Sequence, residues 1–366
     1  ENFRSYDFLE MPINKGITLV HGDNGSGKSS IIESIMYAFS GKSFRTNETD
    51  TLIRKNFKYF QVLVGFDDGQ ILKVTKKANE RAKIVQNKNK KTENYASLVK
   101  KFPTCMVENK EFFFTYTNPE GKRQYLNKLL FYVEQQEQKL INELKKIITQ
   151  RAACLKNKDY NQITYWDQQL INIEPNITKT NKDLCELIND YIRNDELIHH
   201  FAEKNEWIRK IRLIYSPGYE KEANFSEILA KNIEKDMILK RTSEGPHRRS
   251  FKIDLDNCDA SEILSRGQQK IASIILHLLQ RQIIVDKTNQ TPLLLMDDIS
   301  SELDKENSNL MLKYLIDNRV QSIMTSIDQA HFTNPDNVLM FHVEHNGEVS
   351  YAVSYTHLTL PTKRIV

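Results

Sequence analysis

The chain has 366 residues, 39% of them hydrophobic and 27% charged, which is a globular composition and excludes disordered, collagen-like and disulfide-rich classes. The formal net charge is only +4, so overall charge gives little support for a polyanion partner. No apolar run reaches the roughly 20 residues of a membrane span, and no basic-then-apolar leader is visible, so we expect no membrane partner. The four cysteines lie far apart without a CxxC pair, which favours a reducing cytoplasm over a zinc or disulfide framework.

Residues 16–41 predict a strand, a glycine loop and a helix. Ile17–Val20 is a short buried-strand run, and apolar residues recur at helical spacing between the loop and Gly41. The loop between them has the spacing GxxxxGK[ST], in which backbone N–H groups and a helix N-terminus bind phosphates. Lys28 would reach the β- and γ-phosphates and the Ser29 hydroxyl would bind Mg²⁺, whereas an ordinary glycine turn is a weak alternative. The predicted nucleotide-binding residues are Gly22, Asp23, Asn24, Gly25, Ser26, Gly27, Lys28, Ser29 and Ser30. The guanine-reading pattern NKxD is absent, which favours ATP.

A hairpin is expected at residues 60–66 and 70–76, and a lysine-rich stretch, Lys73–Lys101, overlaps it with ten basic and two acidic residues. Lysines contact phosphates without reading sequence, so DNA bound there would be bound with little sequence preference. The alternative is a solvated face. The candidate DNA contacts are Lys73, Lys76, Lys77, Arg81, Lys83, Lys88, Lys90 and Lys91.

Residues 122–240 predict a helical domain. Three apolar stripes have helical spacing and are typical of core packing, while Pro175 and Pro217 are expected to interrupt any single long helix. The stripes are Leu140, Leu144, Ile147 and Leu155; Ile163, Trp166, Leu170 and Ile173; and Leu184, Leu187, Ile188 and Tyr191.

Strand patterns return after residue 240. Strands are expected at Phe251–Leu255, Leu293–Met296 and Gln321–Ile327. A hairpin is expected around the Asn346-Gly347 turn, with strands at Val338–Glu344 and Glu348–Val353. Helices are expected after Ser265 and near Lys305–Asn318. The predicted fold is α/β, with residues 1–110 and 241–354 forming one lobe and residues 111–240 an inserted helical lobe. We expect a short segment before Glu1, and residues 355–366 to be a non-native or disordered tail.

Two further elements carry chemistry. Asp297 and Asp298 follow a buried strand, where Asp297 would hold Mg²⁺ and Asp298 would orient or deprotonate the attacking water; the alternative is helix capping. Ser265 and Gln268 form a capping box, so a helix should begin there. Its N-terminus would offer a second phosphate site, used by the nucleotide of a second chain, unless it is a plain N-cap.

In this order, the elements resemble ABC-type ATPase heads. Gly22–Ser29 matches the Walker A loop, Leu264–Gln268 the signature, Leu293–Asp298 the Walker B strand and Ser301–Asp304 the D-loop. The resemblance implies a P-loop NTPase fold and an ATP-dependent homodimer with ATP between two heads. The residues it implies are Ser265, Arg266, Gly267 and Gln268 acting in trans, Asp304 in the D-loop, Glu108 as a metal ligand in the Q-loop, and Thr325 or Ser326 where transporters place a switch histidine.

Longer stretches resemble the RecF family. They are NFRSY (Asn2–Tyr6), GKSFRT (Gly41–Thr46), NPEGKRQYLNKLLF (Asn118–Phe131), QRAACLK (Gln150–Lys156), WDQQL (Trp166–Leu170), GPHR (Gly245–Arg248), LSRGQQK (Leu264–Lys270) and DDISSELD (Asp297–Asp304). This resemblance implies weak, DNA-stimulated ATP hydrolysis, ATP-dependent binding to gapped single- and double-stranded DNA, and work with RecR and RecO to place RecA. It also implies that Arg4 lies near ATP. The family usually carries an acid after GPHR, where this chain has Arg249 and Ser250.

Other classes fit less well. An SMC/Rad50-like structural head needs a far longer coiled-coil arm than the segment between Lys28 and Ser265, a transporter needs the switch histidine, and a P-loop kinase lacks the signature. A DNA-binding module with a vestigial ATPase stays open, because the sequence does not show whether Asp298 is catalytically competent. Asp298 is one methylene shorter than the glutamate usual in ABC-type heads, which predicts slow turnover.

Overall fold

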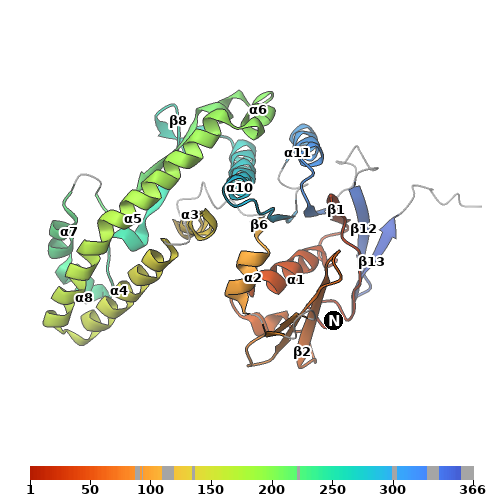
Figure 1. The fold of residues 1–366 in the computed structure, drawn as a ribbon, viewed down its shortest axis with the longest axis horizontal. Coiled ribbons are helices and arrows are strands. Elements are labelled where there is room, and N and C mark those ends of the chain that lie inside the picture. Colours follow the sequence, from red (N-terminus) through yellow and green to blue (C-terminus); the bar gives the residue numbers. More distant parts are fainter. Residues whose placement is uncertain are drawn as a thin grey trace, which may run out of the picture. The chain divides into compact units, whose positions relative to one another are not determined.

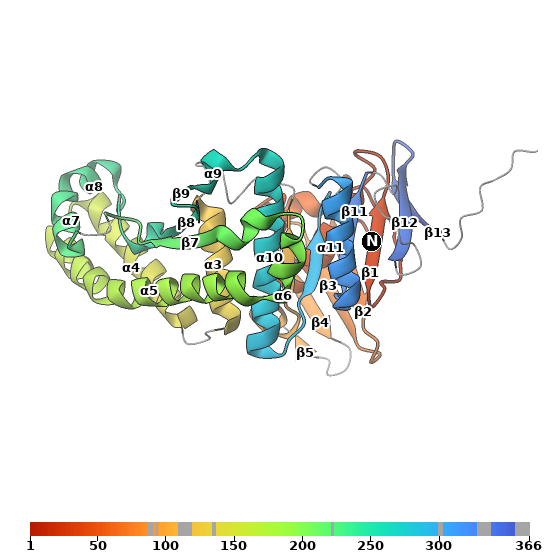
Figure 2. The same ribbon diagram turned by 90° about the horizontal axis from the view of Figure 1, so that it is seen from above.

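The computed structural model describes residues 1–86, 91–92, 94–108, 119–133, 137–220, 223–298, 303–327 and 338–355. The chain forms two compact units, Glu1–Lys110 with Gln290–Val366, and Glu111–Asn289 (Figures 1 and 2). Residues 241–289, which we expected in the ATPase lobe, belong to the second unit. The predicted tail lies outside the described residues from residue 356 onward.

The first unit is built on a six-stranded sheet of order β13-β12-β1-β11-β10-β6, in which only β12 and β13 pair antiparallel. Its central strands are almost entirely buried, as expected for parallel strands covered on both faces. Figure 1 shows α1 (Lys28–Ser40) and α11 (Lys305–Asp317) on opposite faces. The strands are β1 (Ile17–His21), β6 (Thr104–Val107), β10 (Leu293–Met296), β11 (Ser322–Ser326), β12 (Val338–His345) and β13 (Ser350–Tyr355). The expected α/β P-loop fold is confirmed.

A four-stranded antiparallel sheet, β2 (Tyr59–Gly65), β3 (Ile71–Lys77), β4 (Lys83–Gln86) and β5 (Lys91–Thr92), completes this unit and confirms the predicted hairpin. One face packs on α1 through a core rich in aromatic rings, with η1 (Thr49–Leu52) and α2 (Tyr95–Lys101) beside it. The buried members of this core include Phe3, Tyr37, Phe39, Phe60, Leu72, Val74, Ile84 and Leu98.

The second unit is mainly helical, as predicted. Its long helices α4 and α5 run side by side as a hairpin (Figure 2). The helices are α3 (Pro119–Val133), α4 (Glu137–Asn157), α5 (Tyr160–Asn194), α6 (Glu196–Ala202), α7 (Phe225–Lys231), α8 (Ile233–Leu239), α9 (Ala260–Ile263) and α10 (Arg266–Thr288), with 3₁₀ turns η2 (Glu206–Lys210) and η3 (Pro246–Arg248). A three-stranded sheet joins them, formed by β7 (Ile211–Ser216), β8 (Ser250–Leu255) and β9 (Cys258–Asp259).

Two expectations for this unit are wrong. Pro175 does not interrupt a helix, because α5 continues through it for 35 residues. Proline removes one backbone donor, but buried residues on both sides of it, Ile173 and Ile177, anchor the helix. Residues 211–216, expected to be helical, form β7 instead, because their alternating apolar side chains are buried against the partner strand β8.

The stretches QRAACLK and WDQQL supply a buried polar network. The fully buried guanidinium of Arg151 pairs with Asp167 of α5 and with Asp236 of α8, and it also donates to Thr242 Oγ1 at 2.9 Å. The carboxylate of Asp236 in turn accepts from the Ser243 amide at 2.8 Å. These residues therefore hold four segments of the helical unit together.

Helix α10 explains why residues 241–289 belong to this unit. The Tyr125 hydroxyl of α3 donates to the Leu276 carbonyl of α10 at 2.7 Å. Gln280 Nε2 of α10 donates to the Tyr125 carbonyl at 3.0 Å. Near its other end, Asp286 accepts from the Tyr191 hydroxyl of α5 at 2.9 Å.

Among the described helices, none combines the length and hydropathy needed to cross a membrane.

Candidate nucleotide site

The predicted phosphate loop joins the carboxyl end of β1 to the first turn of α1. Gly22 and Gly27 have φ angles of 149° and 112°, a region that favours glycine. A Cβ atom at Gly22 would lie 2.2 Å from the carbonyl oxygen of Val343, and one at Gly27 would lie 2.7 Å from Ser350 Oγ. Strands β12 and β13 thus support the loop from outside, and only glycine fits at these two positions.

Lys28 lies inside this loop. It is 7% exposed, and its ammonium donates to the carbonyl oxygens of Gly22 at 2.6 Å and Asp23 at 2.8 Å. Burial lowers the pKa of Lys28, while the charges of Asp298, Asp297 and Asp23 act in the opposite direction. The buried Ser26 hydroxyl has no hydrogen-bond partner among the described residues. A loop that holds a cation and an unsatisfied buried hydroxyl is suited to an anionic group such as a phosphate.

The two Walker B carboxylates lie at the same edge of the sheet as the loop. The register pairs Met296 with Met324, so Thr325 at the end of β11 lies next to Asp297. The Thr325 hydroxyl donates to Asp297 Oδ1 at 2.7 Å and accepts from the Asp298 amide at 2.7 Å. Because Thr325 is fully buried, these two bonds fix both aspartates relative to the sheet. The family resemblance implied only that Thr325 or Ser326 lies where transporters place the switch histidine. The contacts of Thr325 with the two aspartates depend on strand register, which a local sequence pattern does not show.

The structure places the segments that carry the predicted Mg²⁺ ligands Glu108 and Ser29. Glu108 directly follows β6, whose last residue, Val107, accepts from the Asp297 amide at 3.0 Å. Ser29 stands half-buried in the first turn of α1. Among the described residues, no group of three His, Cys, Asp or Glu side chains could hold a metal by itself. Ser29, Asp297 and Glu108 stay the predicted ligands of Mg²⁺, an ion that usually takes only one or two protein carboxylates beside phosphates.

Arg4 does not contact the phosphate loop. Its guanidinium forms a two-point ion pair with the fully buried Glu33 of α1, at 2.9 and 2.8 Å, and donates to the Thr51 carbonyl at 3.3 Å. Ser43 donates to the same carboxylate, and Arg45 lies 3.7 Å from it. Arg4 therefore ties the N-terminal segment to α1, and its predicted role near ATP stays a prediction.

The signature residues start helix α10 in the second unit. Ser265 and Gln268 form the predicted capping box, with the Ser265 amide 2.9 Å from Gln268 Oε1 and the Gln268 amide 3.3 Å from Ser265 Oγ. Ser265, Arg266 and Gly267 are exposed, as a surface that meets a second chain requires. In the D-loop, Asp304 caps α11 by accepting from the Asn307 amide at 2.8 Å, while Ser301 and Glu302 lie outside the described residues.

A sequence profile of the RecF/RecN/SMC N terminal domain matches residues 1–350. The chain belongs to this family. Its curated relatives named "DNA replication and repair protein RecF" include one from Hahella chejuensis, 29% identical over 363 residues, and one from Shewanella woodyi, 26% identical over 354 residues. These alignments cover 94% of this chain and 95% and 94% of the relatives. The resemblance to RecF is thereby confirmed.

Solved structures agree on the fold. The recombination mediator protein RecF of the RecFOR pathway, solved with ATP, has a TM-score of 0.78 at 23% identity and covers 96% of this chain and 95% of its own. The Smc head domain from Pyrococcus furiosus has a TM-score of 0.56 at 16% identity, covering 97% of this chain and 94% of its own. The ABC-type head of the RecF and SMC proteins is therefore the fold of this chain.

The candidate DNA contacts in the lysine-rich stretch divide into different groups. Lys73 and Lys77 of β3 and Lys83 of β4 are exposed on one face of the four-stranded sheet, and Arg81 is exposed between these strands. Lys76 is excluded, because it is 5% exposed, pairs with Asp50 and donates to two backbone carbonyls. Side chains alternate between the two faces of a strand, so Lys76 points into the core, away from the face that carries Lys73 and Lys77. Lys88 and Lys90 lie outside the described residues, as does the side chain of Lys91.

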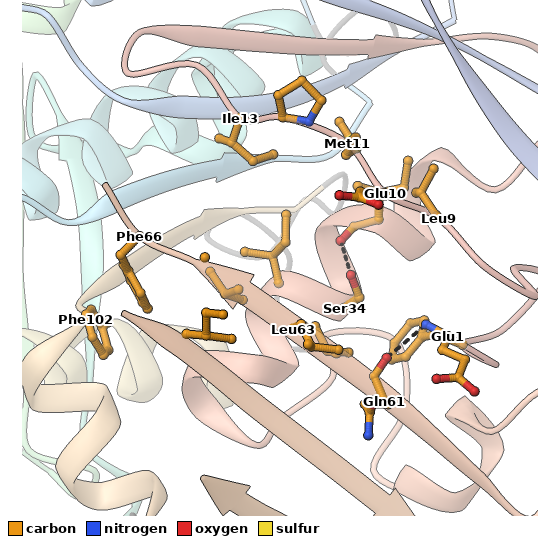
Figure 3. Close-up of a pocket in the computed structure, with 18 of the residues that line it drawn as sticks. Glu1, Leu9, Glu10, Met11, Ile13, Ser34, Gln61, Leu63, Phe66 and Phe102 are labelled. Carbon is orange, nitrogen blue, oxygen red and sulfur yellow. Dashed lines mark hydrogen bonds between the residues drawn. The ribbon is translucent and has the colours of Figure 1, made fainter. Parts of the chain in front are cut away.

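An apolar groove of about 920 Å³ lies elsewhere on the first unit, between the N-terminal segment, α1 and β2 (Figure 3). Leu9, Met11 and Ile13 line one side and Leu63 the other, while Glu1 bonds to Gln61 at its end. Ser30, one of the predicted nucleotide-binding residues, lines the groove, whereas Gly22–Ser29 and the two Walker B aspartates do not. The groove thus borders the first turn of α1 but not the phosphate loop.

Proposed function

We propose that this chain is an ATP-dependent DNA-binding protein of DNA replication and repair, in which ATP joins two heads and slow hydrolysis separates them. The observation that carries the proposal is the convergence of Lys28, Asp297 and Asp298 at one edge of the sheet, together with membership of the RecF/RecN/SMC family. The names of the relatives point to DNA replication and repair, and a related structure holds ATP.

In this proposal, the phosphates lie in Gly22–Ser29 and Lys28 turns from the loop carbonyls to the β- and γ-phosphates. Mg²⁺, held by Ser29, Asp297 and Glu108, would neutralise phosphate charge. Asp298 orients the attacking water or takes its proton. Aspartate reaches less far than the usual glutamate, which supports slow turnover.

ATP-dependent pairing would use the exposed start of α10. Ser265, Arg266 and Gly267 present a helix N-terminus, which attracts the γ-phosphate bound by a second copy of the chain. Hydrogen bonds hold α10 to α3 and to α5. A second chain that docks at Ser265 would therefore restrain α3 and α5 together with α10. Gln268 contributes to the cap itself through its side chain.

DNA would be bound through phosphate contacts with little sequence preference. Lys73, Lys77 and Lys83 share one exposed sheet face, with Arg81 beside them. By the resemblance, the DNA is gapped and the partners in the cytoplasm are RecR, RecO and RecA. An SMC-like structural head is less well supported, since α4 and α5 pack inside a compact unit.

Light scattering with ATP, ADP or no nucleotide tests the scheme. Lys28→Met should abolish ATP-driven dimers, and the scheme is wrong if nucleotide still produces them. Ser265→Arg should spare ATP binding and block pairing; loss of ATP binding instead would mean that Ser265 acts within its own chain.

DNA binding is tested by fluorescence anisotropy on a gapped duplex in the same three nucleotide states. Tight binding only with ATP supports an ATP-gated contact, and equal binding in all states contradicts it. Stimulation of ATP hydrolysis by DNA would exclude a vestigial ATPase.

A further inference from the structure

A buried cation in the second unit has no carboxylate partner in the part of the chain that the structure describes. Arg249 directly follows GPHR, where the RecF resemblance leads us to expect an acid, and it is only 3% exposed. Its guanidinium donates to Asn181 Oδ1 at 3.1 Å, to the Pro246 carbonyl at 3.2 Å and to Asn127 Oδ1. Burial lowers the pKa of Arg249, and the charge of Arg123 lowers it further, although Tyr215 acts in the opposite direction. A buried charge met only by neutral acceptors is costly, because neutral dipoles replace hydration incompletely.

Four more cations lie on the two segments that Arg249 joins. Lys122 and Arg123 lie in the first turns of α3, Arg248 ends η3, and Lys252 is exposed on β8. The segment that carries Arg248 and Lys252 is docked onto α3 by the bond between Arg249 and Asn127. It is also held by the Lys122 ammonium, which lies 5.6 Å from the centre of the Phe251 ring.

These cations repel one another. Burial lowers the pKa of Arg123, which the charge of Glu120 raises and that of Arg248 lowers. Burial likewise lowers the pKa of Lys122, which Asp259 raises and Lys252 lowers. The four cationic side chains form no ion pair with any described residue. The two nearby carboxylates also have other partners, since Glu120 accepts from Gln124 and Asp259 caps α9 through Ser261. Four cations thus lie near two carboxylates, so the protein compensates their charge only in part.

His247 does not add to the charge. Burial lowers its pKa to about 4, so the ring is neutral at pH 7, and its Nε2 lies 3.2 Å from the Thr242 carbonyl. The exposed cluster is therefore made of Arg248 and residues of α3 and β8.

We propose that Lys122, Arg123, Arg248 and Lys252 form a binding surface for the phosphate backbone of double-stranded DNA, while the buried Arg249 holds the segment of Arg248 and Lys252 onto α3. The proposal rests on the DNA-binding function proposed above and adds a contact surface on the helical unit. Phosphates would balance the remaining excess of positive charge, and releasing their counterions favours binding.

Duplex DNA fits this surface better than single strands. Single-strand sites stack bases on exposed aromatic rings, but the rings beside the cluster, Tyr125 and Phe251, are 4% and 1% exposed. Long cationic side chains from α3, η3 and β8, beside aromatic rings that are buried, suit contacts to a backbone whose bases are hidden.

The test uses the double variant Arg248→Gln/Lys252→Gln in the full-length chain, since both side chains are exposed. The matched control is Lys179→Gln/Lys182→Gln, which removes two exposed cations from α5 of the same unit. Anisotropy with ATP present, over a salt series, would measure binding to a blunt duplex and to a single strand. Urea unfolding of each variant checks that the fold is intact.

Counterion release predicts the size of the effect. Losing two phosphate contacts should weaken duplex binding between about tenfold and 60-fold near 0.1 M salt and reduce the salt slope by about two, with single-strand binding and ATP-driven dimerisation unchanged. The control should change duplex affinity less than twofold. Duplex binding equal to that of the unmodified chain would overturn the proposal. Equal losses for duplex, single strand and polyglutamate would also overturn it, in favour of a general anion surface. Absence of DNA binding by the unmodified chain would instead overturn the proposed function.

Discussion

Thr325 is predicted to control Mg²⁺-dependent nucleotide binding without touching the nucleotide. It is fully buried at the end of β11, where its hydroxyl donates to Asp297 and accepts from the Asp298 amide, each at 2.7 Å. Thr325→Val keeps the shape of the side chain and removes both bonds. Asp297 would then lose the partner that fixes its rotamer, and the Asp298 amide would lose its acceptor.

The size of the effect on Mg²⁺ binding follows from the two hydrogen bonds that Thr325→Val removes. A hydrogen bond to a charged group contributes about 1.5–3 kcal/mol, and an amide left without an acceptor costs about 1–3 kcal/mol. Part of this free energy is lost from folding stability and not from Mg²⁺ binding. Removing the group that orients a metal ligand still typically weakens metal affinity about 10–100-fold. We therefore expect the half-saturating Mg²⁺ concentration to rise at least about tenfold.

The assay titrates Mg²⁺ against the binding of a fluorescent ATP analogue, which needs no turnover. Thr325→Ser keeps the hydroxyl and should restore the Mg²⁺ requirement to within about twofold. The matched control is Thr18→Val, because Thr18 is also fully buried in this sheet and accepts from the Asn14 amide at 3.0 Å, but near the amino end of β1. An unchanged Mg²⁺ midpoint for Thr325→Val, or an equal shift for Thr18→Val, would refute the reasoning.

Two further predictions concern stability. Arg4→Ala should lower the free energy of unfolding by about 2–3 kcal/mol without nucleotide, because the fully buried Glu33 keeps only Ser43 and the more distant Arg45; urea unfolding measures this, and unchanged stability combined with weaker ATP binding would assign Arg4 to the nucleotide. Burial lowers the pKa of His247 and of His277 to about 4, so each ring is neutral when folded and takes a proton when unfolded below about pH 6.5. Stability should therefore fall as the pH drops from 6.5 towards 4, by at most about 3 kcal/mol for each ring; His247→Asn should flatten part of this slope, and a urea midpoint that is constant between pH 7.5 and 5 would contradict it.

The parts of the site that depend on local spacing could be predicted from the sequence. The loop Gly22–Ser29 needs a strand before it and a helix after it, and all three patterns lie within one short segment. The capping box at Ser265 depends on a residue only three positions away, and both of its hydrogen bonds are formed. The hairpin turn at Asn346-Gly347 is equally local.

Features that depend on distant segments could not be predicted. Lys76 is one of several similar lysines in the sequence, and only the strand alternation and Asp50 show that it is buried. The contacts of Thr325 require the register between β10 and β11. Strand β7 has a clear alternating pattern, but it is short and follows long helices, so its type became evident only from its pairing with β8.

Tyr125 connects two proposed surfaces of the helical unit. Its hydroxyl and its carbonyl both bond to α10, which begins at the signature residue Ser265, and Tyr125 itself follows Lys122 and Arg123 on α3. Because Tyr125 is 4% exposed and bonded at both ends, α3 and α10 cannot rotate independently without breaking buried hydrogen bonds. A second chain that docks at Ser265 would therefore also restrain the orientation of the α3 cations. This gives ATP-dependent pairing a physical route to DNA affinity that requires no contact between DNA and nucleotide.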